Sequence, residues 1–178
     1  MMAKPSRRTL TVTAAALAIG AGILTWAATS ASAATAAAVI PKCSPGQLDV
    51  WVSPNSANAA AGTGYYHLDF TNVSGSTCHL YGYPGVSAVN SAGKQLGVPA
   101  RRNANVPVRD VNIAPNGTAH AVVGYVDAQL GSGCPHTAAT FLKVYPPDDT
   151  GSRNAWFPLQ VCTNNAVDLT IDAVQAGA

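Results

Sequence analysis

Residues 65–71 read Tyr-Tyr-His-Leu-Asp-Phe-Thr, and this stretch decides the fold. Tyr66, Leu68 and Phe70 alternate with polar or aromatic residues at a period of two. Successive side chains of a β-strand point to opposite faces of a sheet, so the pattern predicts a strand with one apolar face. The same alternation recurs in residues 48–53, 141–145 and 167–173. The chain is therefore predicted to be rich in strands.

Turn-forming residues separate the apolar runs at short intervals, as at Pro84-Gly85 and Pro146-Pro147. Further candidate strands are residues 78–81, 86–90, 106–113, 117–127 and 155–161. Residues 119–130 could also form a helix, but three β-branched valines and an interior glycine favour a strand. Eight or nine short strands separated by turns predict one all-β domain, an antiparallel sandwich packed through its apolar faces.

The first 33 residues have the three regions of a secretory signal. Lys4, Arg7 and Arg8 form a positive region, residues 10–28 are uncharged and apolar on average, and Ala31-Ser32-Ala33 fits a cleavage site. The two arginines also fit a twin-arginine export signal, and a plain positive region explains them equally well. We expect a signal peptide at residues 1–33, a flexible lead-in at 34–40 and a single domain at 41–178.

The formal net charge of +2 belongs to this leader. Ten Lys and Arg residues stand against eight acidic residues, all of them Asp, and removal of the three leader residues leaves a net charge of −1. A near-neutral domain disfavours binding of nucleic acid or of a membrane through a basic face. The Ala- and Gly-rich leader is also a weak membrane span, so we expect no stable membrane anchor after cleavage.

Four cysteines lie in the expected exported part: Cys43, Cys78, Cys134 and Cys162. An even number of cysteines in an exported chain predicts disulfides. Three pairings are possible. The sequential pairing closes two loops of similar length, and each disulfide would stabilise the fold by roughly 3–4 kcal/mol. The cysteines are scattered and form no C-x-x-C pair, so we expect no metal site built from them.

Several motifs resemble one known family. The central one is Asn-Val-Ser at residues 72–74, followed by Cys-His-Leu-Tyr-Gly-Tyr-Pro-Gly-Val at residues 78–86. Weaker ones lie at residues 113–119, 134–135, 142–147 and 161–162. Over roughly residues 43–174, the chain resembles the domain of unknown function 4232 family.

This resemblance implies a protein exported by actinobacteria, with an immunoglobulin-like sandwich and paired cysteines. The family has no agreed activity, so the resemblance implies no catalytic residue. Many members carry a lipid-attachment cysteine that this chain lacks. That difference favours a released or loosely wall-held protein.

The acidic and histidine residues give only weak indications of chemistry. On the polar phase of strands, where we expect solvated side chains, lie Asp49, Asp69, Asp168 and Asp172. Asp148 and Asp149 lie in a turn-forming stretch that does not fit the spacing of a calcium loop. His67 shares a strand face with Asp69, which could orient an imidazole or assist a zinc or copper site, but no metal-binding motif supports this. We expect no catalytic residue, no metal and no cofactor.

Aromatic residues supply the best binding hypothesis. Opposite the aliphatic phase of their strands lie Trp51, Tyr65, Phe141 and Tyr145. Exposed aromatic rings can stack on sugars or anchor a protein partner. The alternatives are that these rings only cover the outer face, or that the strand phase is inverted and they form core. The one basic cluster, Arg101-Arg102, could contact an anionic wall polymer or simply be solvated.

We therefore expect a non-catalytic binding or structural module of the cell envelope or extracellular space. Its partner would be an extracellular glycan or protein. One alternative is a carbohydrate-binding module that uses the surface aromatics. Another is a secreted protease inhibitor with a disulfide-pinned loop near Cys134-Pro135. A hydrolase is the enzymatic alternative.

Overall fold

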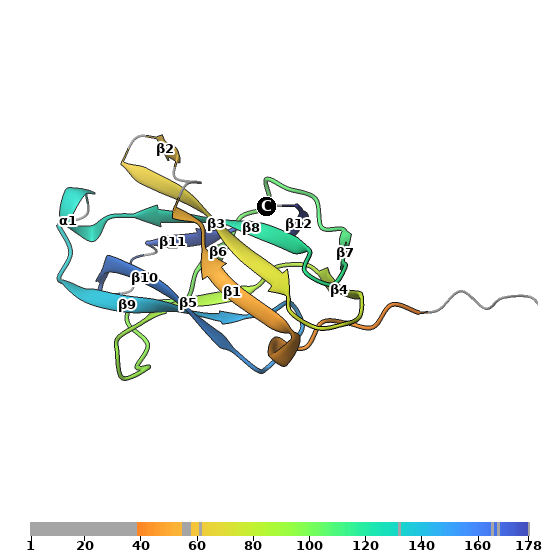
Figure 1. Ribbon diagram of the computed structural model, residues 1–178. Coiled ribbons are helices and arrows are strands. Elements are labelled where there is room, and N and C mark those ends of the chain that lie inside the picture. The colour runs from red at the N-terminus through yellow and green to blue at the C-terminus, as the bar shows by residue number, and fades with distance from the viewer. Residues whose placement is uncertain are drawn as a thin grey trace, which may run out of the picture. The chain divides into compact units, whose positions relative to one another are not determined.

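The computed structural model describes residues 39–54, 58–60, 62–131, 133–164, 166 and 168–177. The expected signal peptide and most of the expected lead-in lie outside the described residues. In Figure 1 the strands of the described domain stack in two layers. The all-β sandwich predicted from the alternation is confirmed.

The larger sheet has seven strands. Its order is β1 (Leu48–Val52), β3 (Thr63–Asn72), β8 (Thr118–Val126), β11 (Leu169–Ile171) and β6 (Arg101–Arg102), with β2 (Asn58–Ala60) paired to β3 and β12 (Gln175–Ala176) paired to β8. The pairing of β11 with β6 is parallel, whereas β1, β3 and β8 pair antiparallel. β3 lies between β1 and β8, so residues that are opposite each other on these three strands share a face.

The smaller sheet has three antiparallel strands, and a separate pair of strands completes the fold. The order of the smaller sheet is β10 (Arg153–Cys162), β9 (His136–Tyr145) and β5 (Gly85–Val89), and the separate pair is β4 (Cys78–Tyr81) with β7 (Asp110–Ile113). Two short helical turns, η1 (Pro45–Gln47) and α1 (Ala128–Gly131), lie between strands. None of the helices in the described part of the chain is long and apolar enough to span a bilayer.

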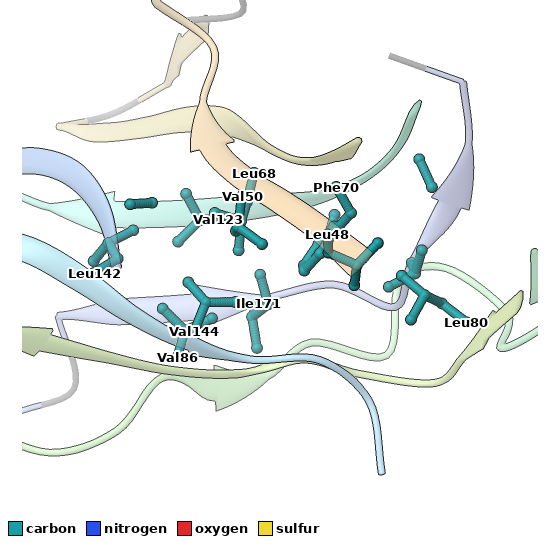
Figure 2. Close-up of a cluster of buried hydrophobic side chains, with 14 of the residues drawn as sticks. Leu48, Val50, Leu68, Phe70, Leu80, Val86, Val123, Leu142, Val144 and Ile171 are labelled. Atoms are coloured by element: carbon teal, nitrogen blue, oxygen red, sulfur yellow. The ribbon is translucent and has the colours of Figure 1, made fainter. Parts of the chain in front are cut away.

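The core lies between the two sheets. Leu68 and Phe70 of β3 are fully buried, as are Leu142 and Val144 of β9, and Figure 2 shows them within one cluster of apolar side chains. Burial of a side chain of this size contributes about 1.5–3 kcal/mol. All four lie on the phase that the alternation predicted to be apolar. Because these side chains point into the core, the alternate residues of each strand point outward and form the outer faces of the sandwich.

The described residues contain twelve strand segments, more than the eight or nine expected, because β2, β6 and β12, each only two or three residues long, were not expected. Segments this short show little alternation and are formed by pairing with longer neighbours. Residues 119–130, for which strand and helix were both considered, are mostly strand. β8 extends to Val126, and the short helix α1 follows it.

Two disulfides staple the domain, and the sequential pairing is the one that forms. Cys43 is bonded to Cys78, with 4.9 Å between their Cα atoms, and Cys134 to Cys162, with 5.7 Å. The bonded residues are separated by 35 and 28 positions in the sequence. Cross-links of this span remove conformational entropy from the unfolded chain.

Asn72 lies at the end of β3, and its side chain is fully buried. Its Nδ2 donates hydrogen bonds to the carbonyl oxygens of Ser76 at 2.8 Å and Ile113 at 2.9 Å. Its Oδ1 accepts the backbone N–H of Ser74 at 2.9 Å and the Ser74 hydroxyl at 2.7 Å. The backbone N–H of Asn72 donates to the Gly117 carbonyl at 2.9 Å. One residue thus joins the end of β3, the loop towards β4, the end of β7 and the turn before β8.

Tyr125 of β8 connects the larger sheet to the edge of the smaller one. Its hydroxyl donates to the carbonyl of Gln160 at 2.8 Å and accepts the backbone N–H of Gln160 at 2.9 Å. Burial raises the pKa of Tyr125 to about 12, so the hydroxyl keeps its proton. β10 is an edge strand, and the two bonds give partners to backbone groups that an edge leaves unpaired.

We predict that Asn72→Ala lowers the free energy of unfolding by about 3 kcal/mol, because it leaves buried donors and acceptors in three segments without partners. Chemical denaturation of the purified protein measures this change. Asn112→Ala is the matched control, since Asn112 is an exposed asparagine on β7 and its loss should change stability by less than about 0.5 kcal/mol. Equal effects of the two substitutions would contradict the role assigned to Asn72.

Candidate functional site

The four aromatic residues identified from the sequence lie on opposite outer faces of the sandwich. Trp51 of β1 and Tyr65 of β3 lie on the outward face of the larger sheet, which we call the large-sheet face. Phe141 and Tyr145 of β9 lie on the outward face of the smaller sheet, which we call the small-sheet face. None of the four belongs to the buried core. The structure therefore does not gather them into one stripe.

The small-sheet face carries the most exposed aromatic side chain of the described residues, Trp156 of β10, which is 69% exposed. Trp156 lies directly opposite Phe141 in the pairing of β10 with β9. Further along β9, the Lys143 ammonium lies 5.4 Å from the centre of the Tyr145 ring. The strand at residues 155–161 is predicted from the sequence, but Trp156 is not among the predicted site residues. Its neighbour Ala155 is buried, so the alternation rule applied to β10 would have found it.

The large-sheet face carries a row of side chains across three strands. Trp51 of β1 lies opposite Asp69 of β3, which in turn lies opposite His120 of β8. Trp51 is 40% exposed, and its Nε1 donates to the Thr71 hydroxyl at 3.3 Å. The rings of His67 and His120 are stacked, with 4.2 Å between their centres and 14° between their planes. The row therefore places one carboxylate beside two imidazoles.

Asp69 is only 1% exposed, and its Oδ1 has no hydrogen-bond partner. Burial raises the pKa of Asp69, and the nearby imidazoles of His67 and His120 offset only part of that rise. The expectation of a solvated aspartate here is wrong. The strand phase was assigned correctly, but side chains from neighbouring strands cover this part of the outer face.

Two other aspartates expected to be solvated are also buried, whereas Asp49 is exposed as expected. Asp168 is 8% exposed, and its Oδ2 accepts the backbone N–H of Cys162 at 2.5 Å. Asp172 is 9% exposed, and burial raises its pKa while a hydrogen bond from Asn103 lowers it. Both residues have hydrogen-bond partners that the polar pattern of the sequence does not reveal.

A hollow of about 310 Å³ opens on the large-sheet face beside Tyr65. It is lined by Thr63, Tyr65, Arg101, Asn103, Gly124, Val126, Asp168 and Thr170. The structure thus brings together Tyr65, Arg101 and Asp168, which the sequence analysis considered separately. It adds Asn103, which lies in a loop after β6, and Thr170, which is on the polar phase of the alternating stretch 167–173 but was not among the predicted site residues.

The remaining candidates are parts of the scaffold. Arg102 does not join Arg101 in a basic patch, because its guanidinium lies 5.5 Å from the centre of the Tyr83 ring. Asp149 belongs to a structured turn, in which its Oδ1 accepts the Gly151 N–H at 2.9 Å. Among the described residues, no group of three His, Cys, Asp or Glu side chains could hold a metal ion.

The central motif, at residues 72–74 and 78–86, contains two residues that stabilise the fold. Asn72 organises the loops at one end of the sandwich, and Cys78 forms one of the two disulfides. A family model described as Domain of unknown function (DUF4232) matches residues 43–175. The chain belongs to this family. No curated protein and no solved structure matches the chain significantly. Membership in DUF4232 assigns no activity to the chain.

We predict that Asp69→Asn raises the melting temperature at pH 7–8, and that this gain shrinks as the pH falls through the raised pKa of Asp69 and is absent below the ordinary value of 3.8. Because the pKa of Asp69 is raised in the folded protein, the native state holds its proton more firmly than the unfolded chain does. Stability is therefore lost as the pH rises from the ordinary value of 3.8 through the raised pKa. Thermal unfolding across this pH range measures the effect.

Asp49→Asn is the matched control, since Asp49 is exposed on the neighbouring strand β1. It should leave the dependence of the melting temperature on pH unchanged. A parallel dependence for the wild type and Asp69→Asn would show that burial of Asp69 does not affect stability.

Proposed function

We propose that the protein is a non-catalytic binding module that works outside the cell, released or loosely held at the wall. The leader-like first 33 residues and the near-neutral charge of the remainder support export without a membrane anchor. The two disulfides support it too, because such bonds persist in oxidising compartments. A stapled sandwich also suits a protein that must stay folded there.

Trp156 is the observation that carries the binding role. Its large side chain stands 69% exposed on a sheet face beside Phe141, although a tryptophan can bury roughly 150–250 Å² of surface. Tryptophan is also enriched among the residues that contribute most to binding energy. Because both strands belong to one sheet, the backbone positions of the two residues are fixed relative to each other. A ligand therefore meets both rings without a rearrangement of the backbone.

The ligand class we propose is an extracellular glycan. Flat aromatic rings on a sheet can stack against the apolar face of a sugar ring, and the neighbouring Lys143 and Asn154 offer hydrogen bonds to its hydroxyl groups. A protein partner is the second candidate, since the same exposed rings could anchor one.

The protease-inhibitor alternative has less support. The inhibitory loop, expected near Cys134-Pro135, would need backbone groups that are free to form hydrogen bonds with the protease. The carbonyl of Pro135 accepts the Thr163 backbone N–H at 2.7 Å and the Thr163 hydroxyl at 3.0 Å. This stretch is therefore rigid, but one of its backbone groups is already occupied.

We predict that the purified protein co-sediments with at least one of insoluble peptidoglycan, chitin and cellulose. Trp156→Ala should weaken that binding about tenfold or more, as expected when a central aromatic contact is lost. Trp51→Ala tests the opposite face in the same assay. Tyr81→Ala is the control, because Tyr81 is 50% exposed on β4 and lies on neither face.

Binding that survives loss of both tryptophans would contradict the role given to the aromatic faces. If none of the three polymers binds, the glycan proposal fails and the protein partner takes its place.

A further inference from the structure

The hollow on the large-sheet face lies where four strands of the larger sheet meet. β3 supplies Tyr65, β8 supplies Gly124, β11 supplies Thr170, and β6 supplies Arg101. Its volume of about 310 Å³ lies at the lower end of the ~300–1,000 Å³ typical of small-molecule sites. The size suits one small ring rather than an extended ligand.

Gly124 forms the floor of the hollow. A Cβ atom placed there would lie 2.4 Å from the Thr170 hydroxyl oxygen and 3.2 Å from Cε1 of Tyr65. No real Cβ approaches other atoms as closely as the first of these distances. Because Gly124 lies directly opposite both Tyr65 and Thr170 in the sheet, the absence of a side chain lets the ring and the hydroxyl approach each other over the backbone.

The polar groups of the hollow are held in place by the surrounding structure. The Asp168 carboxylate is 8% exposed and is fixed by the Cys162 backbone N–H. The backbone N–H of Asn103 donates to the Ile171 carbonyl at 2.8 Å, which anchors Asn103 beside β11. Arg101 is exposed and makes no ion pair with Asp168. Acceptors and donors thus surround one aromatic wall.

We propose that this hollow binds a single pyranose ring of a neutral glycan. The inference rests on the proposed binding function and names the ligand class of a second contact region. The Tyr65 ring offers an apolar wall for the C–H face of the sugar. Donors and acceptors for its hydroxyl groups come from Thr170, from Asp168 and from those groups of the Asn103 amide that the hydrogen bond to Asp172 does not use.

The other ligand classes fit less well. An apolar ligand would remove more water from the Asp168 carboxylate without adding to the hydrogen bond that Cys162 gives it, and burial of a charge with too few partners is costly. An anionic ligand would be attracted by Arg101 but repelled by Asp168 at the same site. A neutral polyhydroxylated ring can accept from Arg101 and donate to Asp168 at once.

The test is an NMR titration of the ¹⁵N-labelled protein with N,N′-diacetylchitobiose, cellobiose, laminaribiose and maltose, each to millimolar concentration. We expect at least one sugar to cause saturable shifts of the Gly124, Asn103 and Thr170 amides. Asn103→Ala and Thr170→Val should each weaken that binding about tenfold, and Tyr81→Ala should not. Thr170→Val keeps the branched shape of the side chain and removes only the hydroxyl, so the test survives even if Asn103→Ala disturbs folding.

The inference is overturned if none of the sugars shifts these amides saturably, or if the two substitutions leave the affinity unchanged. Failure of the proposed function looks different. If the protein co-sediments with a glycan through Trp156 but no sugar shifts the amides of the hollow, the proposed binding function is supported and the proposed site in the hollow is wrong. If neither assay detects a glycan, both fall.

Discussion

The arrangement of the loops at one end of the sandwich depends on the hydrogen bonds of the buried Asn72 side chain. This side chain binds the carbonyls of Ser76 and Ile113, so it fixes the loop that leaves β3 against the end of β7. The Cys43–Cys78 disulfide holds the start of β4, close behind that loop in the chain. With these ends fixed, β3 can run through the larger sheet with one face in the core and the other outward. β3 cannot shift its register without breaking these bonds, so the side chains that it places on the outer face are fixed.

Alternation predicted the longer strands and their buried faces well, because burial of every second side chain leaves a direct mark on the sequence. It could not predict the state of Asp69. That depends on Trp51 and His120, which lie far away in the sequence and are brought beside it only by strand pairing. The hollow escaped prediction for the same reason, since its lining comes from β3, β6, β8 and β11, which are separated in the sequence and meet only through strand pairing. Trp156 is different, since the alternation within its own strand was sufficient to place it outside.

The two outer faces of the sandwich differ in the kind of surface that they offer to a ligand. The small-sheet face presents exposed aromatic surface beside Lys143, whereas the large-sheet face combines Trp51 with buried carboxylates and a polar hollow. Both kinds of surface suit ligands that carry hydroxyl groups and little charge. The near-neutral composition that remains without the leader agrees with such ligands, because it gives no strong field to select an anion or a cation. The two sheets and the two disulfides keep both faces in place.

The central claim is that this fold binds an extracellular glycan and leaves it unchanged. Native mass spectrometry of the protein incubated with solubilised cell-wall glycan tests both parts at once. The account predicts a complex whose released glycan has the same mass as the starting material after prolonged incubation. Recovery of shortened or modified glycan would show a catalytic protein, and the absence of any complex would remove the glycan as its ligand.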